Sequence, residues 1–497
     1  MEALWPGIMA TPKMLAGASS DHLPLRVASR RLVKASEASI EPHVLAVSNL
    51  DLIPGTTQTW VTCVYRKPPA GDFSGVVAAF ESELPAFLNY FFPMAGRIAA
   101  NPASGLPELH CLNQGAELVV AHAGVALGSL DWRVSGRSLK MIKLPYAGDL
   151  PLSVQLVSFT CGGFAVVWAT SGLVADAQAM AALVRTWSEF VRDGGLVTGG
   201  GPSHDRSVFG RPRRRPPYGA ELDGDLAPRA HEHEVNALTA EESFVERLYY
   251  VEARDVARLR DMAGAGAGRR RATRVEALSA YLWKALAAAV AASPRLGEAD
   301  DDRRCRMGWW VDARQRLAAA APERRAALRR YLGNATVYAA GEAAASTVLE
   351  RALPEVAAMV REAVAAVDYD ERCRQLVDWV AARRPAGGAV AAATVGRGSP
   401  TASLTVWATL PGDTDFGFGE AAVAMPAAAS GRLCSAYLCV ASRPGDDGPW
   451  IASAYVWPSL AAALEADEQR IFRPLTAKYL GFTWDKDDDM QYVRPRL

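Results

Sequence analysis

The chain has few of the side chains that titrate or react near neutral pH. Its 497 residues include only 7 histidines and 7 cysteines. The cysteines are odd in number and lie mostly within scattered, strand-like apolar runs, at Cys63, Cys111, Cys161, Cys305, Cys373, Cys434 and Cys439. This pattern favours free thiols in a reducing compartment over a disulfide framework.

The sequence also lacks net charge, because its 54 basic residues match its 54 acidic ones. Nothing global therefore indicates nucleic acid or an anionic membrane as a partner. It contains no uninterrupted run of about 18 apolar residues and no basic-then-apolar secretory signal. We expect a cytoplasmic protein. Because residues 1–26 carry only Glu2 and Asp21 as acids, a plastid transit peptide is the minor alternative.

The sequence predicts no metal site and no nucleotide-binding loop. His231 and His233 flank Glu232, but a pair without nearby Cys or Asp ligands is typical of a polar surface loop. No glycine-rich phosphate loop precedes a predicted helix.

A segment rich in Gly, Pro and Arg, residues 194–217, divides the chain and cannot sustain a long helix or strand. We interpret it as the crossover between two halves, with its arginines in solvent; a polyanion site or nuclear signal is the alternative. The predicted organisation is an amino-terminal domain over residues 1–193, a linker over 194–225 and a carboxy-terminal domain over 226–497. This length is sufficient for two packed α/β halves.

Strands and helices are mixed along the chain, as in α/β folds. Hydrophobic periodicity predicts strands over 45–52, 60–65, 164–169, 306–311, 433–442 and 450–456. It predicts helices over 76–90, 253–262, 274–291 and 458–469, one that begins at Asp176, and an alanine-rich helical region over 342–367 interrupted at Pro354.

The most informative segment is the strand at residues 164–169 with the loop and helix that follow it. From Asp176, one helical face carries Met180, Leu183, Val184, Trp187, Phe190 and Val191. This strand, loop and helix resembles the HxxxDG element of the plant BAHD acyltransferases, which use acyl-CoA to acylate alcohols and amines. In this alignment the motif histidine falls on Gly172.

Six further blocks resemble the same family, in the family's order, from about residue 27 to residue 480. Asp415–Gly419 resembles the DFGWG motif, with Phe418 in place of tryptophan. The others are Ser48–Leu52, Tyr90–Ile98, Val275–Lys284, Val311–Leu317 and Tyr331–Ala335. The chain is identified as a divergent member of this family. The resemblance implies two chloramphenicol-acetyltransferase-like domains with mixed sheets, a channel between them, and part of 399–430 packed against the amino-terminal domain.

The resemblance also implies that the catalytic base is missing. A positioned imidazole has a pKa near working pH, and as a general base it contributes about 10²- to 10⁴-fold in rate. Gly172 has no side chain, and an unassisted hydroxyl at Thr170 or Ser171 is no general base near pH 7. None of the seven histidines lies in a segment that the family places at the channel centre.

The resemblance assigns mainly structural roles to the other motif residues. Asp176 is expected to form an ion pair with Arg314, and it is also a favourable helix cap. Asp415 can accept hydrogen bonds from neighbouring amides or an arginine. Two alternatives remain open for Thr405 and Trp407: they reach the channel, where Thr405 donates to an oxyanion, or they belong to a plain strand with a buried tryptophan.

Gly417 and Gly419 fit tight backbone positions in the Asp415 motif.

As a whole, the sequence predicts a monomer that transfers an acyl group from acyl-CoA, its co-substrate, to a small-molecule amine or alcohol. Transfer is expected to be weak or altered, with a preference for amines. The alternative function is a non-catalytic modulator that binds acyl-CoA or a partner enzyme, and hydrolysis is a third possibility.

Overall fold

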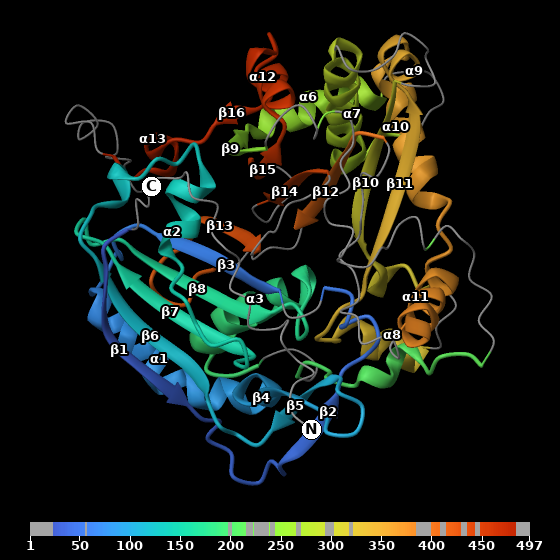
Figure 1. Ribbon diagram of the computed structural model, residues 1–497. Helices are drawn as coiled ribbons and strands as arrows, with labels where there is room; N and C mark the ends of the chain where they lie inside the picture. Colours follow the sequence, from blue (N-terminus) through green and yellow to red (C-terminus); the bar gives the residue numbers. More distant parts are fainter. Residues whose placement is uncertain are drawn as a thin grey trace, which may run out of the picture.

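The computed structural model describes residues 23–54, 57–196, 201–214, 222, 238, 244–264, 270–293, 303–317, 322–383, 399–407, 414–428, 435–442 and 448–483. These residues form two α/β halves that lie side by side, each built on a mixed sheet (Figure 1). The predicted fold class is confirmed. His22, His231 and His233 lie outside the described residues, as does part of the segment 194–225.

The first half contains a six-stranded sheet in the order β1-β6-β7-β8-β3-β13. Its strands are β1 (Leu25–Val33), β6 (Ala116–Ala123), β7 (Leu152–Ser158), β8 (Phe164–Ser171), β3 (Gln58–Tyr65) and β13 (Ala421–Ala428). Only the β6–β7 pairing is parallel. Helices α1 (Phe73–Tyr90) and α3 (Ala177–Asp193) pack on the sheet through Phe80, which stacks on Trp187 and lies 5.8 Å from Trp168 between ring centroids.

The second half contains a seven-stranded sheet in the order β11-β10-β12-β14-β15-β9-β16. Its strands are β11 (Thr336–Ala344), β10 (Arg304–Asp312), β12 (Thr401–Trp407), β14 (Ala436–Ser442), β15 (Trp450–Val456), β9 (Val245–Val251) and β16 (Arg473–Pro474). Strands β10, β12 and β14 run parallel to one another. One face of this sheet packs on α6 (Ala253–Gly264), α7 (Arg274–Ala292), α10 (Leu353–Ala365) and α12 (Pro458–Ala466).

A three-stranded sheet and short helices complete the described structure. The small sheet has the order β2-β5-β4, with β2 (His43–Ala46), β5 (Pro107–Cys111) and β4 (Arg97–Ala100). The remaining α-helices are α2 (Leu139–Ile142), α8 (Pro322–Arg329), α9 (Ala345–Glu350), α11 (Tyr369–Arg383) and α13 (Ala477–Leu480). The 3₁₀ turns are η1 (Phe92–Ala95), η2 (Leu127–Ser129), η3 (Ser135–Arg137), η4 (Arg206–Phe209) and η7 (Ala313–Gln315).

Strand β13 comes late in the sequence but lies in the sheet of the first half. It pairs antiparallel with β3, with Met425 opposite Thr62, and the two strands lie side by side in Figure 1. A strand that follows β12 of the second half therefore ties the two halves together. The segment 399–430 is divided between them, since β12 belongs to the seven-stranded sheet.

The prediction of a helical region over residues 342–367 is wrong at its beginning. Glu342 lies in β11, and its carboxylate pairs with Arg304 and Arg306 on the neighbouring strand β10. Cross-strand pairing outweighs the helical propensity of the alanines here. Two helices, α9 and α10, follow, and Pro354 lies in the first turn of α10, where its missing N–H costs no helical bond.

Helix α7 is, by length and composition alone, apolar enough to cross a membrane. In the structure 56% of its most apolar window is buried inside the protein, as in the core helix of a soluble domain. Its buried residues include Trp283 and Leu286, which belong to the core under the seven-stranded sheet.

Candidate active site

The backbone of Gly172 is held by contacts from both halves of the protein. Strand β8 ends at Ser171, and Gly172 is buried directly after it. The Gly172 N–H donates to the Thr57 carbonyl at 2.7 Å, and the Gly172 carbonyl accepts from Asn334 Nδ2 at 2.8 Å. Thr57 precedes β3 of the first half, whereas Asn334 precedes β11 of the second. Both polar groups of the Gly172 backbone therefore have partners.

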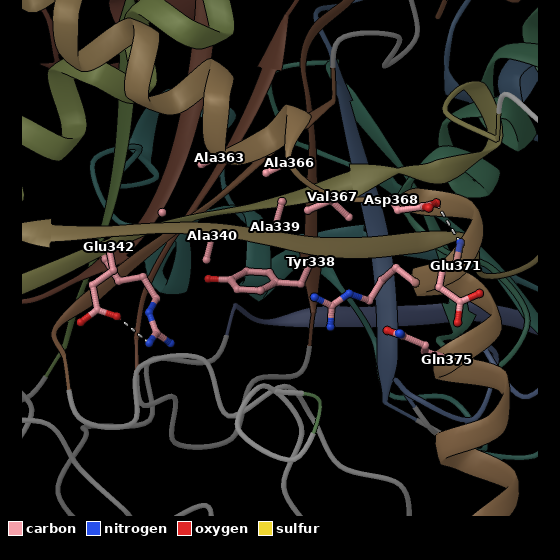
Figure 2. Close-up of a pocket in the computed structure, with 13 residues that line it drawn as sticks. Tyr338, Ala339, Ala340, Glu342, Ala363, Ala366, Val367, Asp368, Glu371 and Gln375 are labelled. Carbon is pink, nitrogen blue, oxygen red and sulfur yellow. Dashed lines mark hydrogen bonds and ion pairs between the residues drawn. The ribbon is translucent and has the colours of Figure 1, made fainter. Parts of the chain in front are cut away.

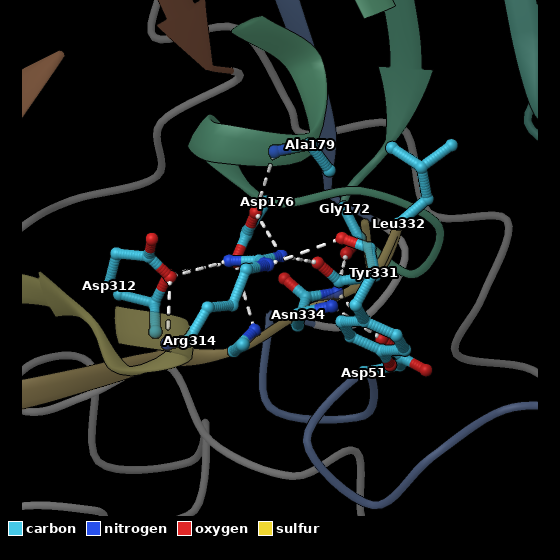
Figure 3. Close-up of polar contacts among 12 residues, drawn as sticks. Asp51, Gly172, Asp176, Ala179, Asp312, Arg314, Tyr331, Leu332 and Asn334 are labelled. Carbon is cyan, nitrogen blue, oxygen red and sulfur yellow. Dashed lines mark hydrogen bonds and ion pairs between the residues drawn. The ribbon is translucent and has the colours of Figure 1, made fainter. Parts of the chain in front are cut away.

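Asn334 is itself fixed by the buried carboxylate of Asp51. The Asn334 backbone N–H and Nδ2 both donate to Asp51 Oδ1, at 2.9 and 3.0 Å (Figure 3). The other oxygen accepts from the Ser48 N–H at 2.8 Å and lies 3.3 Å from Arg206 Nε. Asp51 is therefore a paired structural carboxylate, and its described contacts are to Asn334, Ser48 and Arg206 rather than to Gly172.

The sequence does not single out the residues of this network. Asp51 and Asn334 lie in the blocks Ser48–Leu52 and Tyr331–Ala335, which resemble the family as blocks and mark neither residue. Arg206 lies in the predicted linker, yet it is buried and its guanidinium donates to the carbonyls of Val174 and Leu332. The described part of the linker thus packs against the candidate site.

The expectation of a solvated arginine cluster also needs correction at Arg213. Its backbone N–H and Nε donate to the carboxylate of Asp378, at 2.7 and 2.6 Å, and its terminal nitrogens pair with Glu371. Arg213 therefore fastens the crossover segment to α11.

Asp176 forms the expected ion pair with Arg314. Arg314 Nη1 lies 2.9 Å from Asp176 Oδ2, and Nη2 lies 3.0 Å from Oδ1, in a bidentate pair with both side chains 5% exposed (Figure 3). Asp176 also caps α3 by accepting from the Ala179 N–H, and it accepts from Ala335 N and Thr336 Oγ1. These partners occupy the carboxylate and join α3 to the second half.

The surroundings of Asp176 stabilise its charged form. Burial by itself would raise the pKa of this carboxyl, but the Arg314 guanidinium and the hydrogen bonds to Arg314, Ala335 and Ala179 outweigh it, so that the pKa is lowered. Such a group stays ionised at neutral pH.

Thr405 and Trp407 lie on the face of β12 that points toward the first half. The neighbouring residues Leu404 and Val406 pack into the helix-covered core of the second half. Because side chains alternate along a strand, Thr405 and Trp407 face the other way, and Trp407 belongs to the core cluster that includes the first half and this face of the second sheet. Strand β12 contacts α3, the helix that follows the Gly172 loop. Thr405 Oγ1 accepts from the Tyr437 hydroxyl at 3.0 Å.

The motif Asp415–Gly419 forms a tight turn. Asp415 Oδ1 accepts from the N–H groups of Gly417 and Gly419 at 2.8 and 2.9 Å. The two glycines have φ angles of +101° and +88°, in the region that favours glycine. Phe416 is buried and packs edge-on against the Tyr65 ring.

This turn lies away from the Gly172 loop. Tyr65 ends β3 and pairs with the first residue of β8, whereas Ser171, next to Gly172, pairs with Gln58 at the other end of β3. The two ends of an eight-residue strand are about 24 Å apart. The structure therefore brings Gly172, Asp176 and Arg314 together and separates them from Asp415, Gly417 and Gly419.

The histidines in the described part of the chain are engaged elsewhere. His43 Nδ1 contacts the Glu41 carbonyl, and His110 Nε2 contacts the Glu108 carboxylate. His122 Nδ1 contacts Ser158 Oγ, and His204 Nε2 contacts the Tyr90 carbonyl. Among the described residues there is also no group of three or more His, Cys, Asp or Glu side chains suited to a metal ion.

The pockets formed by described residues include two that are not lined by Gly172, Thr405 or Trp407. The larger, of about 780 Å³, lies between β11, α10 and α11, where Tyr338 and Glu342 project from β11 (Figure 2). The smaller, of about 410 Å³, lies between η4 and α11. Residues 55–56, which precede Thr57 in the sequence, and residues 408–413, which follow Trp407, lie outside the described ranges. The channel at Gly172 stays a prediction.

The chain is similar to plant hydroxycinnamoyl transferases over most of its length. It is 27% identical over 450 residues to hydroxycinnamoyl-CoA:5-hydroxyanthranilate N-hydroxycinnamoyltransferase HHT4 of Avena sativa, covering 86% of this chain and 94% of the relative. It is 26% identical to putrescine hydroxycinnamoyltransferase of Oryza sativa subsp. japonica, with coverages of 81% and 90%. It is also 26% identical to the fatty alcohol:caffeoyl-CoA acyltransferase of Arabidopsis thaliana, with coverages of 82% and 90%.

Solved structures show the same fold at low sequence identity. Vinorine synthase superposes with a TM-score of 0.61 at 18% identity, covering 92% of this chain and 98% of that one. TRI101 of F. sporotrichioides, solved with coenzyme A and T-2, gives a TM-score of 0.66 at 17% identity, covering 86% and 98%. The two halves therefore have the chloramphenicol-acetyltransferase-like architecture. A family model described as the transferase family matches residues 23–469, and the chain belongs to this BAHD family of acyltransferases, which use acyl-CoA as co-substrate.

Proposed function

We propose that this protein transfers an acyl group from acyl-CoA to a small-molecule acceptor without a side-chain general base, and that it prefers amines over alcohols. The observation that carries the proposal is the state of residue 172. Glycine supplies no proton acceptor there, while its backbone keeps partners from both halves of the protein. The scaffold of the motif loop is thus intact although its imidazole is missing.

The preference for amines follows from the proton balance of the reaction. An alcohol must lose its proton as it attacks the thioester carbon, and a positioned base contributes about 10²- to 10⁴-fold to this step. An amine that is neutral when bound attacks through its lone pair and loses its proton afterwards. Alignment of the two substrates can by itself lower the barrier by about 7–11 kcal/mol. Acyl transfer to an amine therefore remains physically accessible without the base.

The names of the relatives are consistent with this range of acceptors. They include an N-hydroxycinnamoyltransferase, a putrescine hydroxycinnamoyltransferase and an acyltransferase of fatty alcohols. Amines and alcohols thus both occur among proteins similar to this chain. A cytoplasmic location and a monomeric state stay predictions.

The test compares amine and alcohol acceptors with the purified protein. Hydroxycinnamoyl-, benzoyl- and malonyl-CoA serve as donors, and product formation is followed by mass spectrometry. We expect amides to form and esters to form far more slowly. Esters formed at the rate of amides would contradict the proposal.

Restoring the base provides the sharper comparison. Gly172→His should raise the rate with an alcohol by about 10²- to 10⁴-fold and change the rate with an amine much less. Gly172→Ala is the matched control, since it adds a side chain without a base and should produce no gain with an alcohol. Thermal unfolding of each variant verifies that the loop tolerates the change.

The second candidate is a non-catalytic protein that binds acyl-CoA or a partner enzyme, and the same missing imidazole favours it. Acyl-CoA that binds only the native state must raise the melting temperature. A clear shift together with no product from any acceptor, in the wild type and in Gly172→His, would support this candidate against acyl transfer.

A further inference from the structure

Tyr437 of β14 is held against Thr405 by the pairing of two neighbouring strands. Strands β12 and β14 run parallel, with Ser403 opposite Tyr437 and Thr405 opposite Cys439. The Tyr437 hydroxyl reaches diagonally to Thr405 and donates to its Oγ1 at 3.0 Å. Tyr437 packs against the core cluster that contains Trp407, so both side chains lie on the face of the sheet that points away from its covering helices and toward the first half.

The direction of this hydrogen bond determines what Thr405 can do. A hydroxyl group carries one donor and two acceptor sites. Tyr437 fills one acceptor site of the Thr405 hydroxyl, and within the described ranges no other side-chain hydrogen bond of Thr405 is found. The O–H of Thr405 is thus left to donate on the face of β12 that points toward the first half. A hydroxyl that accepts one hydrogen bond also becomes a stronger donor in a second.

Burial keeps Tyr437 in its donor form. Removal from water raises the pKa of its phenol well above the usual range, the nearby Cys439 raises it further, and the hydrogen bond with Thr405 lowers it only in part. The phenol therefore carries its proton throughout the working pH range, and its orientation toward Thr405 does not depend on pH there.

We infer that Tyr437 is a positioning residue for acyl transfer: its hydroxyl bond to Thr405 Oγ1 directs the Thr405 O–H at the oxygen of the thioester carbonyl. This inference rests on the proposed function. As the amine nitrogen bonds to the carbonyl carbon, the C=O π electrons move to oxygen, and the Thr405 O–H stabilises that oxyanion. The oxygen electron pair then re-forms the C=O bond as the C–S bond breaks, the C–S electrons leave with the CoA sulfur, and the proton lost by nitrogen neutralises that thiolate.

A double-mutant cycle tests the inference with an amine acceptor. Thr405→Val removes the proposed oxyanion donor and should lower kcat by about 10²- to 10³-fold. Tyr437→Phe removes the phenol hydroxyl, and with it the hydrogen bond to Thr405 and the contact with Cys439, and should lower kcat by about 3- to 10-fold, with KM nearly unchanged. In the Thr405→Val background, Tyr437→Phe should have no further effect, because Tyr437 acts only through Thr405.

Tyr338→Phe is the matched control. Tyr338 lies on the same sheet but hydrogen-bonds to Ser403 at 3.1 Å instead of Thr405, so its loss should leave kcat near the wild-type value. Thr405→Ser keeps the hydroxyl and should rescue both the rate and the sensitivity to Tyr437→Phe. Tyr437→Met, a second side chain without a donor, replaces Tyr437→Phe if that variant unfolds below the assay temperature.

The outcomes separate this inference from the proposed function. If the wild type acylates amines but Tyr437→Phe does not lower kcat, the role of Tyr437 is wrong and the proposed function stands. The same holds if Tyr437→Phe still lowers kcat in the Thr405→Val background. Failure of the wild type to acylate any amine overturns the proposed function and this inference with it.

Discussion

Replacement of Asp176 by asparagine should destabilise the protein without acting on the chemistry. The change preserves shape but removes the charge that faces Arg314 in a bidentate contact with both side chains 5% exposed. Breaking a buried ion pair on one side costs about 3–5 kcal/mol. Asp312, 2.8 Å from Arg314 Nη1, still offsets part of the buried Arg314 charge that loses its partner Asp176. We therefore expect a loss near the lower limit, about 3 kcal/mol in the free energy of unfolding.

The assay is denaturant unfolding followed by tryptophan fluorescence, with 13 tryptophans as probes. Asp261→Asn is the matched control, because Asp261 pairs with Arg271 at 3.0 Å while both side chains are more than 60% exposed. Such a pair contributes less than about 1 kcal/mol. Equal losses in the two variants would refute the reasoning. So would a loss of acyl transfer in Asp176→Asn at unchanged stability, since the carboxylate would then act in catalysis.

The difference in unfolding free energy between the wild type and Asp176→Asn should become smaller at acidic pH. The pKa of Asp176 is lowered in the folded protein, so its contribution is complete above the unfolded-state pKa of about 3.9 and is lost as pH falls through the folded-state value. The stability gap between wild type and Asp176→Asn should therefore be constant from about pH 5 to 8 and narrow only below about pH 4.

Three further predictions concern the turn, the exposed thiol and the pocket ion pair. Gly417→Ala should lower the free energy of unfolding by about 1–3 kcal/mol, because the φ angle of Gly417 is +101°. Gly148→Ala should change it little, because Gly148 has an ordinary φ angle and an added Cβ there would have no atom within 4 Å. Equal effects of the two substitutions would contradict backbone strain at Gly417. Iodoacetamide should label Cys161 first among the six described cysteines, since the rest are buried. Peptide mapping that finds another of these six labelled before Cys161 would disprove this. Burial raises the pKa of Glu342, but its bonds to Arg306, Ser399 and Arg304 outweigh burial and lower the pKa to about 2. The wild type should therefore be more stable than Glu342→Gln by a constant amount above about pH 4.5, and this difference should disappear as the pH falls through 2. A difference that stays constant down to pH 2 would contradict the prediction.

Local patterns predicted the elements that depend on neighbours in the chain. Helix α3 and its cap at Asp176 follow from hydrophobic spacing and a short polar side chain before it, and both can be recognised in a single segment. The turn at Asp415 is similar, because its glycines and its carboxylate act within five residues. The α/β class and the family blocks were also within reach of the sequence.

Contacts between distant segments needed the tertiary structure. Alanines near Glu342 favour a helix locally, but pairing with β10 makes that segment a strand. Arg206 lies in a sequence typical of a solvated linker, yet it is buried and pairs with Asp51, which is 155 positions away in the chain. Tyr437 has no local signal, since its contact with Thr405 exists only because β12 and β14 are neighbours. The sequence by itself determined the family, the local elements and the missing imidazole; the fold decided which side chains meet around that residue, because long-range pairing and burial are set by the whole chain.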